Sequence, residues 1–145
     1  MGLIVLDTSV LVYAVGTEHP LREPCRRLIA SLGDGVEATT TIEVIQEFAH
    51  VRARRRSRGD ANGLARSFIT ALAPLLVPTT TDLVDGLVLF GQHPALDCFD
   101  AVLAATCVAR RAEALVSADQ AFADIDGLNR VDPAGPDLDR LLASS

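Results

Sequence analysis

The sequence contains no lysine, and all 13 of its basic residues are arginine. Functions that need a lysine, such as Walker-type phosphate binding and Schiff-base catalysis, are therefore excluded. The motifs G-x-G-x-x-G and G-K-S/T are also missing, which argues against the common nucleotide-binding folds. No apolar run approaches the roughly 18–20 residues of a membrane-spanning helix, so we expect no membrane partner.

Cysteine is scarce, with three residues and no C-x-x-C pair, which argues against a zinc site. Cys98 and Cys107 fall on one predicted helix, where a rise of ~1.5 Å per residue separates them by about 13 Å, too far for a disulfide. We therefore expect free thiols and a cytoplasmic protein.

The length of 145 residues suits one domain, and we expect residues 1–145 to form it. Hydrophobic residues make up 49% and charged residues 22%, which is the balance of a globular protein. The net charge of −6 argues at first sight against a nucleic-acid partner, because phosphate affinity comes from cations.

Short apolar runs typical of strands alternate with longer helical patterns along the chain. Strands are predicted at residues 3–6, 36–39, 75–77 and 114–117, with a last edge strand near Val131. Helices are predicted at residues 8–15, 20–32, 40–56, 61–73, 79–93 and 97–111, and weakly in the tail. Strands separated by such helices are joined by right-handed crossovers. The sequence therefore predicts an α/β fold with three α/β/α layers and a central, mainly parallel sheet.

Two aspartates follow predicted strands. Asp7 comes directly after residues 3–6, and Asp119 lies two residues beyond residues 114–117. Ligands of parallel sheets bind at the carboxyl ends of the strands, so both acids fall where a site is expected. Aspartate is also a common turn and N-cap residue, and that simpler role stays open for each of them.

Asp100 is the only charged residue between Cys98 and Ala109, on a helix whose apolar composition indicates burial. A buried carboxylate is costly unless a cation or hydrogen-bond donors compensate it. The alternative is that Asp97 is the N-cap and that Asp100 faces the helix dipole. That explains Asp97 well and Asp100 less well, because two acids three residues apart repel each other. We therefore assign Asp100 to a functional site.

The helix after Thr40 offers two glutamates, Glu43 and Glu47, four residues apart on one face. Thr40 and Glu43 have the spacing of a capping box, which gives Glu43 a structural role. Glu47 has no such role and lies at the core boundary, so we choose it as the candidate ligand. A solvated polar face is the alternative for both glutamates.

Four acids from four separate segments would repel one another if they converged. Two carboxylates about 4 Å apart repel by about 4 kcal/mol at an effective dielectric constant of about 20, so a divalent cation would have to hold them together. Oxygen ligands without histidine or cysteine suit Mg²⁺ or Mn²⁺. Such an ion activates water and neutralises phosphodiester charge, which is the chemistry of a nuclease.

Four segments in this order resemble the motifs of the PIN-domain ribonucleases, most closely the VapC-like toxins of bacterial toxin–antitoxin pairs. The segments are residues 3–9, 44–48, 99–106 and 114–119, and the resemblance extends to about residue 131. It implies a PIN-like fold in which the catalytic residues and Mg²⁺ ligands are Asp7, Glu47, Asp100 and Asp119, oriented by Thr8 or Ser9 and by Ser117. It also implies an endoribonuclease that cleaves RNA by metal-activated water, forms a homodimer and is inhibited by a small cognate antitoxin.

Several features stay open. Asp97 and Asp124 are additional acids without an assigned role. Residues 52–58 contain five arginines, of which Arg52, Arg54, Arg55 and Arg56 are the candidate RNA-binding residues. A solvated helix end and an antitoxin contact are the alternatives for this cluster. The opposing hypothesis for the whole chain is a catalytically inactive PIN-fold binding module whose acidic pocket holds an arginine of a protein partner.

Overall fold

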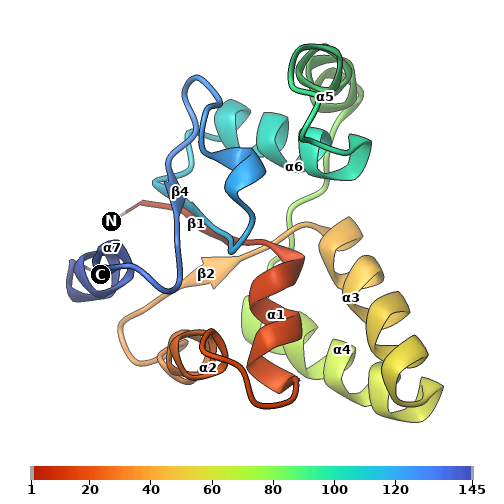
Figure 1. Cartoon of the computed structure of the whole chain (residues 1–145), viewed down its shortest axis with the longest axis vertical. Helices are drawn as coiled ribbons and strands as arrows, with labels where there is room; N and C mark the ends of the chain where they lie inside the picture. Colours follow the sequence, from red (N-terminus) through yellow and green to blue (C-terminus); the bar gives the residue numbers. More distant parts are fainter. Residues whose placement is uncertain (1, 145) are drawn as a thin grey trace.

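The computed structural model describes residues 2–144, which form a four-stranded parallel sheet with helices around it (Figure 1). The strands are β1 (Ile4–Leu6), β2 (Ala38–Thr39), β3 (Ala114–Val116) and β4 (Arg130–Val131), in the spatial order β2-β1-β3-β4. The helices are α1 (Thr8–Val15), α2 (Arg22–Ala30), α3 (Ile42–Arg55), α4 (Arg58–Leu72), α5 (Thr80–Gln92), α6 (Cys98–Ala109) and α7 (Pro136–Ala143), with a 3-10 turn η1 (Gln120–Phe122). All pairings between these strands are parallel, which confirms the predicted α/β fold.

Helices cover both sides of the sheet (Figure 1). Helices α1 and α2 lie on one side, with α3 and α4 beyond α1, and α6 lies on the other side with α5 packed outside it. The strands β1 and β3 are buried along their whole length, as their uninterrupted apolar sequences predict. Among residues 2–144 there is no helix with the length and apolar character to cross a membrane.

Strands β1 and β3 are neighbours at the centre of the sheet, with Leu6 paired to Val116. The N–H of Asp7 extends this ladder by donating to the carbonyl of Val116 at 3.0 Å. Because the two strands run in the same direction, the residues that follow them emerge at the same edge of the sheet. This brings Asp7 and the segment after Val116 together.

The start of α3 corrects the predicted capping box. Thr41 is the N-cap, and its side chain accepts a hydrogen bond from the N–H of Val44 at 3.2 Å. Thr40 is fully buried, and its Oγ1 donates to the carbonyl of Leu6 at 2.6 Å. The capping role predicted for Glu43 is therefore wrong, because the N3 residue of the helix is Val44.

The predicted strand at residues 75–77 does not form. Leu76 makes a single parallel bridge to Thr41. Pro74 and Pro78 flank this segment, and neither has an N–H that could donate to a ladder. The chain therefore passes the end of β2 without adding a full strand to the sheet.

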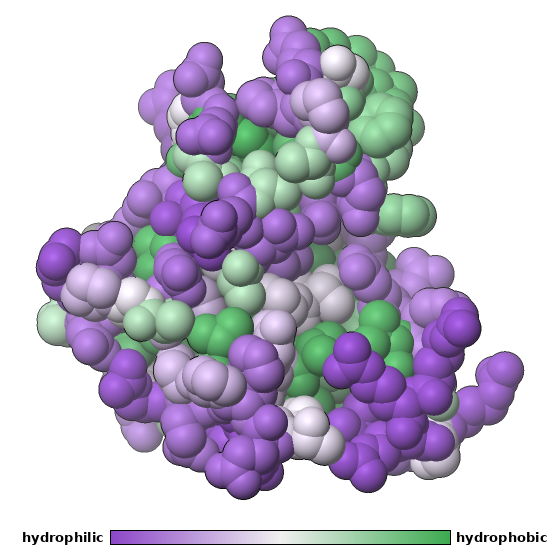
Figure 2. Space-filling view, in the orientation of Figure 1, coloured by the Kyte–Doolittle hydropathy of each residue, from purple (hydrophilic) through white to green (hydrophobic). Residues whose placement is uncertain are grey.

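Helix α5 packs on α6 through a close contact at Gly86. A Cβ atom on Gly86 would lie 2.8 Å from the Cα atom of Val102. On the same face of α5, the buried carboxylate of Asp82 pairs with Arg110 at 3.0 Å and completes a capping box with Thr79. These contacts fix α5 on α6 and leave its outer face exposed, where hydrophobic side chains gather at the top right of Figure 2.

Candidate active site

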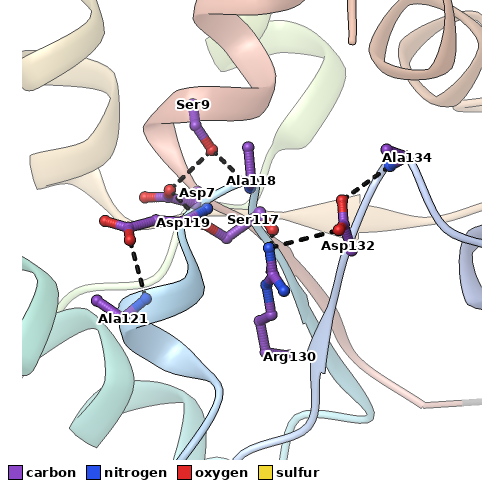
Figure 3. Close-up of polar contacts among 9 residues, drawn as sticks. All are labelled: Asp7, Ser9, Ser117, Ala118, Asp119, Ala121, Arg130, Asp132 and Ala134. Atoms are coloured by element: carbon purple, nitrogen blue, oxygen red, sulfur yellow. Dashed lines mark hydrogen bonds and ion pairs between the residues drawn. The ribbon is translucent and has the colours of Figure 1, made fainter. Parts of the chain in front are cut away.

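Asp7 lies at the junction of β1 and α1, where it is buried. Its Oδ2 accepts two hydrogen bonds, from Ser9 Oγ at 2.9 Å and from Ser117 Oγ at 2.7 Å (Figure 3). Burial raises the pKa of Asp7 above 3.8, although these hydrogen bonds act in the opposite direction. The two serines therefore orient the carboxylate without neutralising it.

Ser117 connects Asp7 to Asp119 across the edge of the sheet. Ser117 is fully buried at the end of β3, and its Oγ accepts a hydrogen bond from the N–H of Asp119 at 3.0 Å. The Oδ1 of Asp119 accepts from the N–H of Ala121 at 2.9 Å, so Asp119 caps η1 (Figure 3). Asp119 thus has the turn role that its residue type predicts, and it also lies beside the other acids.

Glu47 reaches the same region from the middle of α3. Its Oε2 accepts a hydrogen bond from Oγ1 of Thr8, the first residue of α1, at 3.2 Å. Desolvation in this position raises the pKa of Glu47, and the charges of Asp7 and Asp97 raise it further. The structure therefore places Glu47 beside the carboxyl edge of the sheet.

Asp100 is a carboxyl group of this site whose pKa lies far above its ordinary value. Burial raises its pKa from 3.8 to about 8, with further contributions from the charges of Asp7, Asp97, Glu47 and Asp119. Asp97 is the N-cap of α6, and its Oδ1 accepts from the N–H of Asp100 at 2.7 Å. Both interpretations of this pair thus apply, since Asp97 caps the helix while Asp100 lies among the other acids.

The donor chemistry of this cluster fits a hard divalent cation. None of the four acids forms an ion pair with an arginine in the described part of the chain. Within residues 2–144 no three His, Cys, Asp or Glu side chains form a ready-made coordination sphere. The site instead offers uncompensated carboxylate oxygens from four elements, which is the ligand type that Mg²⁺ and Mn²⁺ prefer. These acids are Asp7, Glu47, Asp100 and Asp119.

A pocket of about 400 Å³ opens beside two of these acids, between the start of α3 and the start of α5 and α6. Glu47 and Asp100 line it together with Glu43. Most of its remaining wall is apolar, from Val44, Pro78, Leu83, Phe99, Val102 and Leu103. The acidic cluster therefore has an apolar recess next to it, which no pattern in the sequence predicts.

The arginines at the end of α3 divide into two kinds. Arg52 is largely buried, with its side chain 13% exposed, and it donates to the carbonyl of Val15 at 2.9 Å and pairs with Asp60. Arg52 therefore joins α1, α3 and α4, which is a structural role. Arg54, Arg55 and Arg56 are exposed. A second pocket, of about 260 Å³, lies between Arg55, Arg56 and apolar side chains of α1 and α3.

Asp124 is exposed and is not among the acids whose charge raises the pKa of Asp100. Arg130, which the sequence analysis missed, donates from Nε to the carbonyl of Ser117 at 3.0 Å and so braces the end of β3 (Figure 3). No motif in the sequence signals this contact, because it depends on how β4 pairs with β3.

Comparison with known proteins identifies the class to which this fold and site belong. Residues 4–128 match the PIN domain family, and the chain therefore belongs to that family. It is 51% identical over 142 residues to Ribonuclease VapC7 of Mycobacterium tuberculosis, a match that covers 97% of this chain and 98% of that protein. It is 32% identical over 124 residues to Ribonuclease VapC23 of the same species, covering 83% of this chain and 96% of that protein. Within the PIN domain family, the chain is a VapC-type ribonuclease toxin.

Solved structures share the fold at low sequence identity. VapBC2 of Rickettsia felis, bound to a DNA fragment of its promoter, superposes with a TM-score of 0.72 at 15% identity, covering 90% of this chain and 98% of that one. VapC20 of Mycobacterium tuberculosis, a toxin that cleaves the sarcin–ricin loop, superposes with a TM-score of 0.71 at 17% identity, covering 83% of this chain and 92% of that one. These similarities agree with the parallel sheet and its helical layers.

Proposed function

We propose that this ribonuclease is a Mg²⁺-dependent endoribonuclease that hydrolyses RNA phosphodiester bonds, and that Mn²⁺ can replace Mg²⁺. The observation that carries the proposal is the convergence of four acids at the carboxyl edge of the sheet without an arginine partner. The proposed ligands are Asp7, Glu47, Asp100 and Asp119. Bound there, the ion would supply a water of lowered pKa and neutralise charge on the phosphate.

The chain's own residues prepare the acids for this task. Ser9 and Ser117 hold Asp7 by hydrogen bonds, and Thr8 holds Glu47, so neutral hydroxyl groups position both carboxyl groups. In the metal-free protein burial raises the pKa of Asp100 to about 8, so a cation that binds there competes with a proton. We therefore expect cleavage to increase as the pH rises toward 8.

The test is RNA cleavage by protein purified free of antitoxin. A labelled, structured RNA is incubated with the protein in EDTA, in Mg²⁺ and in Mn²⁺. Cleavage that needs the metal, and that the nearly isosteric change Asp100→Asn abolishes, supports the proposal. If the folded protein cuts no RNA at any metal concentration, the inactive binding module becomes the better description.

A protein antitoxin is the proposed regulator. The solved structures that share the fold include a toxin–antitoxin complex from Klebsiella pneumoniae and a DNA-bound VapBC from Salmonella typhimurium, with TM-scores of 0.66 and 0.68.

We propose Arg54, Arg55 and Arg56 as contacts to RNA phosphates. The apolar pocket beside Arg55 and Arg56 favours a second candidate role, because an acidic antitoxin segment with an apolar side chain would fit it better than a phosphate chain would. Substituting these arginines and measuring the affinity for RNA and for the antitoxin separately distinguishes an RNA contact from an antitoxin contact.

The outer face of α5 is the proposed homodimer contact. Its apolar side chains Val84, Leu87 and Val88 are each about half exposed. Such an apolar patch on a single helix indicates a surface that is buried in a protein–protein contact. We propose that residues 1–145 act as one unit in the cytoplasm and pair with a second copy through this face. Replacing Val84 and Val88 by serine should halve the mass measured by light scattering.

A further inference from the structure

Phe99 is the most exposed of the large apolar side chains in the described part of the chain, at 75% exposure. It lies at the start of α6, next to Asp100 in the sequence. The helix around it is otherwise well packed, with Ala101, Leu103 and Ala104 buried. A phenylalanine ring that is exposed to water contributes little packing to the isolated chain. Because this ring lies beside Asp100, we look for its role in a contact with a bound ligand.

Phe99 forms one wall of the 400 Å³ pocket beside the acidic cluster. On α6, Leu103 lies one turn after both Phe99 and Asp100, so the three residues form one continuous strip of the pocket wall. Glu47 faces them from α3. The pocket thus joins an apolar recess with an aromatic edge to two of the proposed metal ligands.

We propose that this pocket is a nucleobase subsite and that Phe99 is the surface on which a base next to the scissile phosphate stacks. The inference rests on the proposed RNA cleavage and names the part of the substrate that the pocket recognises. Aromatic side chains stack on bases of any sequence, and a neutral base suits apolar walls.

Charge favours a base over the other occupants of such a pocket. Glu43, Glu47 and Asp100 line it, so a phosphate inside the recess would be repelled while a phosphate at its mouth could use the bound cation. A second copy of the chain packed on Phe99 would bury Glu47 and Asp100 without a cation partner, which is costly. The base is the neutral part of the RNA, and it lies within one nucleotide of the phosphate.

The experiment compares four substitutions of Phe99 on two kinds of RNA. The first kind is a short oligonucleotide that the wild type cuts once, and the second is the same oligonucleotide lacking one base, made once for each side of the cut. Phe99→Ala and Phe99→Leu should lower kcat/KM on the intact RNA by about 5- to 150-fold, mainly through KM. Phe99→Tyr and Phe99→Trp should remain within a few-fold of the wild type. On the RNA that lacks the stacked base, all variants should be equal.

Direct evidence for stacking comes from fluorescence, because the chain contains no tryptophan. The double variant Phe99→Trp, Asp100→Asn contains a single tryptophan as the fluorescent reporter and should not cut the RNA that it binds. Intact RNA should quench this tryptophan, and the RNA lacking the base should not. Equal activity of Phe99→Leu and the wild type, or an equal loss by Phe99→Ala on both RNAs, would overturn the subsite.

The matched control is Phe90→Ala on α5, which removes an exposed phenylalanine that does not line the pocket. It should leave kcat/KM unchanged on both RNAs. If Phe99→Ala changes the oligomeric state in light scattering and loses activity equally on both RNAs, Phe99 belongs to a protein interface and the subsite is refuted. If the wild type itself cuts no RNA, the proposed function fails, an outcome distinct from failure of the subsite alone.

Discussion

Asp100→Asn should make the metal-free protein more stable at alkaline pH while it abolishes cleavage. Burial and four neighbouring acids raise the pKa of Asp100 to about 8 in the folded state, whereas the unfolded chain has the ordinary value of 3.8. Between these two values the folded state holds a proton that the unfolded state has lost. Stability therefore falls as the pH rises from about 4 to about 8, and asparagine, which does not titrate, removes this loss.

The size of the effect follows from the pKa. A rise from 3.8 to about 8 corresponds to about 6 kcal/mol if the carboxyl group is fully shielded from solvent. Asp100 is only partly buried, and solvent screening reduces the interaction between the acids, so we expect about 2 kcal/mol. For a chain of this size that is roughly 5–8 °C in Tm.

Thermal unfolding followed by circular dichroism in EDTA measures this gain. The difference in Tm between Asp100→Asn and the wild type should be small near about pH 4 and should grow to its full value by about pH 8.5. Asp124→Asn is the control, since it removes the same charge from an exposed position away from the cluster and should not show this growth. Mg²⁺ should raise the Tm of the wild type more than that of Asp100→Asn. If the difference in Tm between Asp100→Asn and the wild type is the same at both pH values, the assignment of Asp100 to a repulsive acidic cluster is refuted.

Three other changes test the remaining parts of the structure. Glu47→Gln should reduce cleavage by at least about 100-fold and Glu43→Gln by less than about 3-fold in the same RNA assay; the reverse order would show that Glu43 is the ligand. Arg55→Ala with Arg56→Ala should weaken RNA binding and lower the slope of log affinity against log salt by about 1–2, and an unchanged slope would mean that these arginines contact no phosphate. Gly86→Ala should destabilise the fold by about 1–3 kcal/mol in urea unfolding, because the new methyl group meets the backbone of α6, and a stabilised variant would contradict that packing.

The sequence predicts the two central strands closely and locates the two edge strands, but it does not predict every segment beside the sheet, for a physical reason. Residues 3–6 and 114–117 are apolar without alternation because a central parallel strand is buried on both faces, and that pattern is local. The edge strands β2 and β4 form within or beside the predicted positions at residues 36–39 and near Val131, but each has only two residues, so the sequence does not define their bounds. The cap of α3 depends on a tertiary contact. The hydroxyl of Thr40 donates to the carbonyl of Leu6, and Thr41 is the N-cap residue.

The acids were predictable because strand ends of a parallel sheet share one edge, so Asp7 and Asp119 could be placed together from the sequence. The choice of Glu47 rested on a capping box for Glu43 that does not exist. It is now supported by the hydrogen bond from Thr8 instead. The contact of Arg130 and the pocket beside Phe99 could not be predicted, since they arise where segments distant in the sequence meet.

The way this chain distributes its arginines explains how an acidic protein can act on RNA. Six ion pairs with aspartate or glutamate occur in the described part of the chain, and all of them lie outside the four-acid cluster. Hydroxyl groups orient Asp7 and Glu47 instead, and a hydroxyl positions a carboxylate without cancelling its charge. An arginine from the same chain would stabilise the fold and occupy the place that a cation needs. Under the proposed function, the negative charge that first argued against a nucleic-acid partner is the binding site of the metal cation, whose own charge then attracts the phosphate.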